Sequence, residues 1–82
     1  MNTVAVSLIE TGVSSISRRE AEILFLMSEG KANKEIAACL SLSVHTVQAH
    51  LKNIYRKLDV HNKIEALNKT KWLLASLFGN RN

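Results

Sequence analysis

The residues with the most evident chemistry lie between positions 44 and 58, where polar side chains recur at helical spacing. Projected as a helix at about 100° per residue, the segment separates into three stripes of different character. One stripe consists of His45, Gln48, Ala49, Lys52 and Arg56. Amide and ammonium groups can pair with adenine and guanine edges in the major groove, and an alanine can contact a thymine methyl group. This stripe is therefore a candidate surface for reading base pairs.

A second polar stripe lies on the flank of the first. It consists of Thr46, His50, Asn53 and Lys57. Short hydroxyl and amide groups beside an ammonium can hold phosphates, and such contacts fix register rather than sequence preference. A solvated helix face would carry a similar mixture of side chains, so a surface without any partner is the alternative for each stripe taken alone.

The third stripe is apolar and indicates how the helix is held. Its members are Val44, Val47, Leu51, Ile54 and Leu58. We expect this side to face the core, with Ser43 as the N-cap of the helix and residues 59–62 as a tight connection after it.

Two shorter helices are expected before this one. Ser17 and Glu20 have the spacing of a capping box, and the helix that they start should end at Gly30, which favours the left-handed conformation. A short second helix is expected with Asn33 as its N-cap. With the turn at 41–43, the second and third helices form a helix-turn-helix, whose second helix enters the major groove.

A fourth helix is expected from Lys63 to about Leu77, with Asn62 and Glu65 as another capping pair. Its apolar side should include Ile64, Leu67 and Leu74. The predicted fold is all-α and tetrahelical.

The predicted domain spans 16–78, between a flexible N-terminal tail or linker at 1–15 and a short C-terminal tail at 79–82. The 82 residues carry a formal net charge of +4. Residues 45–72 hold six basic and two acidic side chains, whereas residues 1–30 hold two basic and four acidic ones. The positive field is thus concentrated where the polar stripes lie, which suits a polyanionic partner.

Other functional classes find little support. Cys39 is the single cysteine, so no internal disulfide can form, and we expect a small half-buried side chain in a reducing, cytoplasmic compartment. No apolar run approaches the roughly 18 residues of a membrane span. His45 and His50 lie on different helix faces, which does not suit a shared metal. We expect no metal, no cofactor and no enzymatic activity, with Glu20, Glu22 and Glu29 as capping or surface charges and Trp72 packed on the fourth helix.

The sequence resembles the LuxR/NarL-type (GerE-like) helix-turn-helix domain over about residues 16–78. The resemblance is carried by Ile16 to Leu24, Gly30, Asn33 to Ala37, Leu40, Thr46, Val47, His50, Asn53, Ile54, Lys57, Leu58, Glu65 and Ala66. The run from Asn53 to Asn62 is especially similar to the C-terminal effector domains of MalT-type activators.

This resemblance implies a double-stranded DNA partner, paired half-sites near promoters and a weak homodimer through the fourth helix at about 63–77. RNA polymerase is a further candidate partner. Base-edge positions of the family fall on Gln48, Ala49 and Lys52, to which the stripe adds His45 and Arg56. Backbone-contact positions fall on Asn33, Lys34, Thr46, His50, Asn53 and Lys57.

Three residues depart from the family pattern. Gln48 stands where lysine is frequent, which alters the preferred base. Arg18 replaces a proline, a change that a first helical turn tolerates. Phe25 occupies a usually polar, outward position, and we expect it either to fold over the N-terminal segment or to contact another domain or subunit.

Two alternative functions fit the same pattern. A sigma-factor-like promoter-recognition domain has a helix-turn-helix of similar spacing, although the fourth helix argues against it. A protein-interaction module could keep the fold and use the exposed helix to hold a partner protein.

Overall fold

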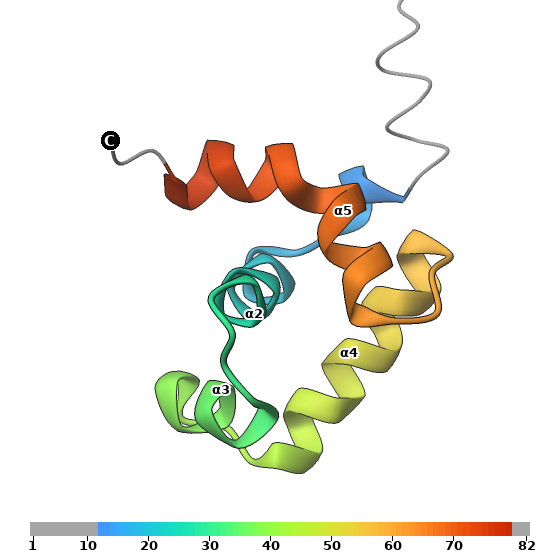
Figure 1. Ribbon diagram of the computed structural model, residues 1–82. Coiled ribbons are helices and arrows are strands. Elements are labelled where there is room, and N and C mark those ends of the chain that lie inside the picture. Colours follow the sequence, from blue (N-terminus) through green and yellow to red (C-terminus); the bar gives the residue numbers. More distant parts are fainter. Residues whose placement is uncertain (1–11, 80–82) are drawn as a thin grey trace, which may run out of the picture.

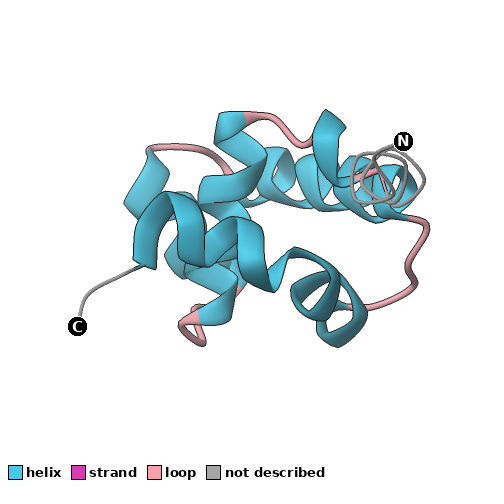
Figure 2. Ribbon diagram, turned by 90° about the horizontal axis from the view of Figure 1, so that it is seen from above, coloured by secondary structure: helices cyan, strands magenta, loops and turns pink. Residues whose placement is uncertain are grey.

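Helices make up nearly all of the part of the chain that the computed structural model describes, residues 12–79. The four main helices are α2 (Arg18–Ser28), α3 (Asn33–Leu40), α4 (Val44–Leu58) and α5 (Lys63–Leu74). A short 3-10 turn, η1 (Val13–Ser15), precedes them, and a π-helical segment, η2 (Ala75–Gly79), continues α5 (Figures 1 and 2). The all-α, tetrahelical prediction is confirmed.

Local capping explains where the first and third of these helices begin. At α2, the Ser17 hydroxyl accepts from the Glu20 amide at 3.1 Å, and the Glu20 carboxylate accepts from the Ser17 amide at 2.9 Å. The chain then turns at Gly30, whose φ of 87° is left-handed. At α4, the Ser43 hydroxyl accepts from the Thr46 amide at 3.0 Å. These predicted caps are confirmed.

The other two caps differ in detail from the prediction. The N-cap of α3 is Ala32 rather than Asn33, and the helix start is stabilised by the Glu35 carboxylate, which accepts from the Ala32 amide at 2.7 Å. At α5, Asn62 accepts from the Glu65 amide as expected, but the Glu65 carboxylate accepts from the amide of His61. A carboxylate at the third helical position can thus cap an amide without a matching hydroxyl.

The core lies where α4 packs against α2, α3 and α5. On the apolar stripe of α4, Val47, Ile54 and Leu58 are fully buried and Leu51 nearly so, as predicted. Val44 is the exception, since 38% of it is exposed. It lies in the first turn of the helix, and only the later members of the stripe are enclosed.

The packed part of the chain begins before the boundary expected at residue 16. Val13 in η1 is buried against the core, and η1 contacts both α4 and α5. Gly12 has a φ of 77°, and a Cβ there would lie 1.8 Å from the carbonyl oxygen of Lys57. Only glycine fits this close approach. The rest of the predicted tail, residues 1–11, lies outside the described residues, as do 80–82.

Helix α5 buries two of the three residues predicted for its apolar side. Leu74 is buried and Leu67 is half-buried, but Ile64 is 71% exposed. Trp72, expected to pack on this helix, is 50% exposed. Because the apolar periodicity of this helix is weak, helical spacing alone did not separate Ile64 from the buried residues.

Phe25 has a partner that the sequence did not indicate. Its ring stacks on Phe78 of η2, with centroids 4.7 Å apart and planes at 25°, and the Arg18 guanidinium lies 4.9 Å from the Phe78 ring centroid. Within residues 12–79 the aromatic partner of Phe25 is thus Phe78, and the expected contact with the N-terminal segment or with another domain or subunit stays a prediction. Cys39, expected to be half-buried, is exposed on α3.

Candidate nucleic-acid interface

The helix-turn-helix is built from α3, a short turn and α4, and its turn lies across the molecule from η1 and η2 (Figure 1). Ser41 ends α3 in the left-handed conformation, with a φ of 57°. The Leu42 amide then donates to the carbonyl of Ala37 at 2.8 Å, and the half-buried Leu42 packs against the core. The turn is thereby fixed from both its backbone and its side chain.

The predicted base-reading residues share the exposed side of α4. All five are exposed: His45, Gln48, Ala49, Lys52 and Arg56. The buried stripe at Val47, Leu51 and Ile54 determines this orientation, since residues on the opposite side of the helix must then face solvent. The helix thus presents a polar surface around the small Ala49 side chain, through which its backbone can approach a partner closely.

The predicted phosphate-binding residues divide into two groups. Lys34 on α3 and Thr46 on α4 are exposed, whereas Asn33 at the start of α3 and His50 on α4 are half-buried. The Thr46 hydroxyl lies 2.9 Å from the hydroxyl of Ser43, the N-cap of α4. All four residues thus keep some exposed surface on the two helices of the helix-turn-helix.

Asn53 and Lys57, which complete that set, have a partner inside the protein. The Lys57 ammonium lies 2.7 Å from Glu20 Oε1 and donates to the carbonyl of Ser15 at 2.8 Å. The Asn53 amide donates to Glu20 Oε2 at 3.2 Å. Both residues thus have partners inside the protein, on the flank of α4 that faces α2 and η1, and these partners compete with the phosphate contacts expected of them.

Glu20 is the buried centre of this group, with 3% of its surface exposed. Burial by itself raises the pKa of its carboxyl, but hydrogen bonds from Lys57, the Ser17 amide and Asn53 outweigh that effect and hold the pKa below its usual range. The carboxylate is therefore charged and fully partnered at neutral pH.

Sequence reasoning identified Glu20 as a cap and missed its second role. A capping box accounts for its contact with Ser17, whereas its other partners lie 33 and 37 residues away on α4. The available signal was that Asn53 and Lys57 are polar residues directly beside the buried stripe, where an internal partner is often required.

Arg56 is the last member of the group. Its guanidinium donates to the side-chain amide oxygen (Oδ1) of Asn53, one turn back along α4. It remains exposed, so this hydrogen bond joins the internal group to the surface of the helix.

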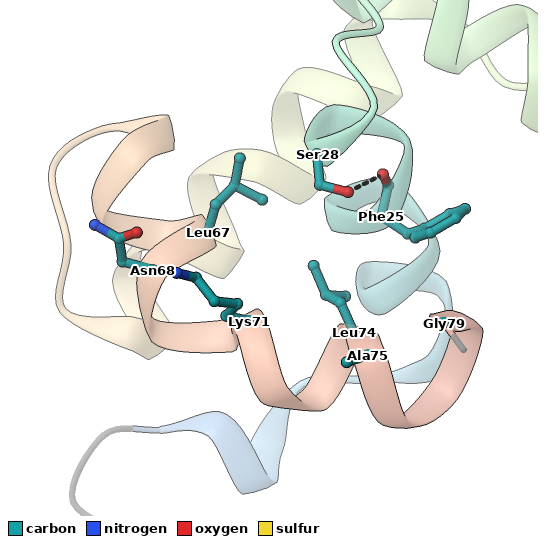
Figure 3. Close-up of a pocket in the computed structure, with 8 residues that line it drawn as sticks. All are labelled: Phe25, Ser28, Leu67, Asn68, Lys71, Leu74, Ala75 and Gly79. Atoms are coloured by element: carbon teal, nitrogen blue, oxygen red, sulfur yellow. Dashed lines mark hydrogen bonds between the residues drawn. The ribbon is translucent and has the colours of Figure 1, made fainter. Parts of the chain in front are cut away.

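The hollows in the described part of the chain lie elsewhere. One of about 300 Å³ lies between α2 and the α5–η2 helix, where Phe25 and Ser28 face Leu67 and Leu74 (Figure 3). Another follows α4 and includes His61 and Glu65 in its lining. Among residues 12–79, no three His, Cys, Asp or Glu side chains are grouped as metal ligands, and no helix is long and apolar enough to cross a membrane.

Residues 14–70 match the family described as bacterial regulatory proteins, luxR family. The chain belongs to this family. The match includes α2, α3, α4 and the first part of α5, and therefore the complete helix-turn-helix. The family is one of DNA-binding transcription regulators rather than of enzymes.

Individual relatives agree with this membership. The chain is 52% identical over 54 residues to the uncharacterized response regulatory protein YgeK of Escherichia coli, a match that covers 66% of this chain and 37% of the relative. It is 48% identical over 52 residues to the transcriptional regulatory protein LiaR of Bacillus subtilis, covering 63% and 25%. With the transcriptional activator protein CarR of Pectobacterium carotovorum, identity is 46% over 63 residues, covering 77% and 25%. In each case the match spans well under half of the relative.

Proposed function

We propose that this chain binds double-stranded DNA sequence-specifically, with α4 in the major groove. The observation that carries the proposal is the exposed surface of α4, where Gln48, Ala49 and Lys52 project together from a helix whose opposite side is buried. Gln48 is suited to adenine, Lys52 to guanine, and Ala49 to a thymine methyl group. His45 and Arg56 extend the same surface at its two ends.

Phosphate contacts are proposed on both helices of the helix-turn-helix. Asn33 and Lys34 lie in the first turn of α3, and Thr46 and His50 lie on α4. Lys34 and Thr46 are exposed, whereas Asn33 and His50 are half-buried. The first turn of α4 contains no acidic residue, so its unpaired amides and the positive end of the helix dipole are open to an anion. Such contacts would fix how deeply and in which register α4 enters the groove.

We further propose that two copies associate weakly through α5 on paired half-sites. Ile64 is 71% exposed and Trp72 is 50% exposed, and both lie on the side of α5 that faces away from the core. Large apolar side chains on one exposed side are typical of a contact surface. Ile64→Asp should abolish cooperative binding to paired half-sites while leaving the affinity for a single half-site unchanged.

The groove assignment can be tested by fluorescence titration with duplex DNA over a range of salt concentrations, after a bound sequence has been selected from a random pool. Lys52→Ala should weaken specific binding by about 1–3 kcal/mol and relax the preference at one base pair. Lys63→Ala removes the same charge from an exposed position at the start of α5 and serves as the matched control. Equal binding by the parent and Lys52→Ala would contradict the assignment.

The same titrations separate the alternatives. A protein-interaction module should show no salt-dependent affinity for duplex DNA. A sigma-factor-like domain should bind polymerase core as a monomer, whereas the proposed domain should pair on its half-sites. RNA polymerase as an additional partner can be tested by adding it to the DNA complex. A reducing, cytoplasmic location and the absence of catalysis are further parts of the proposal, supported by membership of a family of DNA-binding regulators.

A further inference from the structure

The two oxygens of the buried Glu20 carboxylate have different partners. Oε1 accepts from the Ser17 amide at 2.9 Å and from the Lys57 ammonium at 2.7 Å. Oε2 accepts from the Asn53 side-chain amide at 3.2 Å. The first oxygen thus joins the start of α2 to the end of α4, and the second acts on a residue in the middle of α4.

The contact at Oε2 determines which way the Asn53 amide is turned. An ionised carboxylate can only accept hydrogen bonds, so the NH₂ group of Asn53 must face it. The carbonyl oxygen of Asn53 then points the other way, where the Arg56 guanidinium donates to it. Asn53 and Arg56 are three residues apart, a spacing that makes side chains neighbours on a helix.

We propose that Glu20 is a positioning residue for DNA binding, which acts through the Asn53 amide to orient the Arg56 guanidinium on the exposed surface of α4. This inference rests on the proposed function. An arginine is long and flexible, and holding it in one orientation before binding reduces the conformational freedom that is lost when it contacts DNA. The ligand of Arg56 is a hydrogen-bond acceptor of DNA, either a guanine edge or a phosphate oxygen.

The proposal can be tested by exchanging the hydrogen-bond donor and acceptor between residues 20 and 53. Glu20→Gln keeps the shape of the side chain and an acceptor for Ser17 and Lys57, but it places an NH₂ group where Oε2 was. Asn53 must then turn its own side-chain oxygen toward that new NH₂ group, so that its own NH₂ group faces Arg56. A guanidinium has no acceptor, so the hydrogen bond between Asn53 and Arg56 is lost. Glu20→Gln should therefore weaken specific DNA binding about as much as Arg56→Ala does, roughly tenfold.

The reciprocal change should restore the relay. In the double variant Glu20→Gln/Asn53→Asp, the glutamine introduced on α2 donates to the carboxylate introduced on α4, whose other oxygen accepts from Arg56, and the net charge of the parent is kept. We expect the double variant to recover most of the affinity that Glu20→Gln loses. Asn53→Asp alone places two carboxylates in contact and should not bind like the parent.

Affinity is measured by titration of the selected duplex and of a random duplex, at a temperature where urea unfolding shows each variant to be folded. A loss confined to the selected duplex identifies a guanine edge, and an equal loss on both identifies a phosphate. The second readout needs no DNA: the NMR signal of the Arg56 side-chain Nε–H should shift in Glu20→Gln and return in the double variant.

Two results would overturn the relay, namely a double variant that binds no better than Glu20→Gln, or an Arg56 signal that is unchanged in Glu20→Gln. These are distinct from failure of the proposed function. A parent chain without salt-dependent affinity for any duplex would refute both the DNA-binding proposal and the role of Arg56 in it, even if the NMR signals still reported the hydrogen bonds.

Discussion

The two halves of α4 share one buried stripe but differ in what their polar side chains do. In the first half, His45, Gln48 and Ala49 are exposed around a helix start that only Ser43 caps. In the second half, Asn53 and Lys57 are bound to a buried carboxylate from α2. The polar side chains of the first half are thus exposed to a partner, while Asn53 and Lys57 in the second half are engaged inside the protein.

This division assigns different consequences to residues that look alike in the sequence. Lys52 and Lys57 are lysines on the same helix, five residues apart. Lys52 is exposed, whereas Lys57 bridges Glu20 and the carbonyl of Ser15. We therefore expect substitution of Lys52 to change DNA binding, and substitution of Lys57 to change stability.

The largest effect is expected at the anchor itself. Glu20→Ala removes the carboxylate that accepts from the Ser17 amide at the start of α2 and leaves the Lys57 ammonium without its partner, so it should cost about 3 kcal/mol in the free energy of unfolding, measured with urea. Glu22→Ala is the matched control in the same helix, because Glu22 meets only the exposed Arg18 and Arg19. It should change stability by less than about 0.5 kcal/mol. Similar losses of unfolding free energy in Glu20→Ala and Glu22→Ala would contradict the anchoring of α4 by Glu20.

The next largest effect is expected from two lysine substitutions on α4 that should act on different properties. Lys57→Ala should lower the free energy of unfolding by about 1–3 kcal/mol, because a buried carboxylate loses its charged partner, and should leave the salt dependence of DNA binding unchanged. Lys52→Ala should do the reverse, weakening DNA binding while leaving urea unfolding within about 0.5 kcal/mol of the parent. If Lys57→Ala lowers the salt slope by about one, the lysine contacts phosphate after all.

A smaller effect is expected at the start of α4. Ser43→Ala removes the hydroxyl that accepts from the Thr46 amide, and should destabilise the protein by about 1 kcal/mol in thermal or urea unfolding. Because the first turn of α4 frays more easily without its cap, the backbone amides of residues 44–47 should exchange their hydrogens faster. The amides near Asn53 and Lys57, where α4 is bound to Glu20, should exchange at the parent rate. Uniform acceleration along α4 would show that the two halves open as one unit.

The smallest effect concerns pH. The pKa of Glu20 is lowered in the folded protein, so its charge contributes stability that is fully present above the unfolded value of about 4.5 and is lost as pH falls through the folded pKa. The difference in unfolding free energy between the parent and Glu20→Gln should therefore be constant near pH 7 and shrink as pH falls below about 4.5. A difference that does not depend on pH would mean that the charge of Glu20 adds nothing.

The parts of the fold that the sequence predicted are those fixed by neighbouring residues. The Ser17–Glu20 cap, the turn at Gly30 and the Ser43 cap each depend on side chains within a few positions of the backbone groups that they bind. The buried stripe of α4 is strongly periodic, so its opposite face and the five exposed candidate residues followed directly from it.

The parts that the sequence did not predict depend on which elements meet. Asn53 and Lys57 lie at the edge of the apolar stripe, and helical projection alone does not tell whether that edge faces solvent or α2. The same holds for Phe25, which projects from the outer side of α2 and is covered only because η2 returns to place Phe78 against it. On α5, Ile64 follows the helical pattern of a core residue but is 71% exposed.

The contact between Gly12 and the carbonyl of Lys57 constrains how the molecule can be joined to anything else. The chain enters beside the end of α4 and leaves through η2, and in Figure 1 both segments lie across the molecule from the α3–α4 turn. A fluorophore, a surface tether or a fused protein attached next to Gly12 or Gly79 would therefore start on the side of the domain opposite that turn. An attachment at either of these two positions would leave the α3–α4 turn unobstructed.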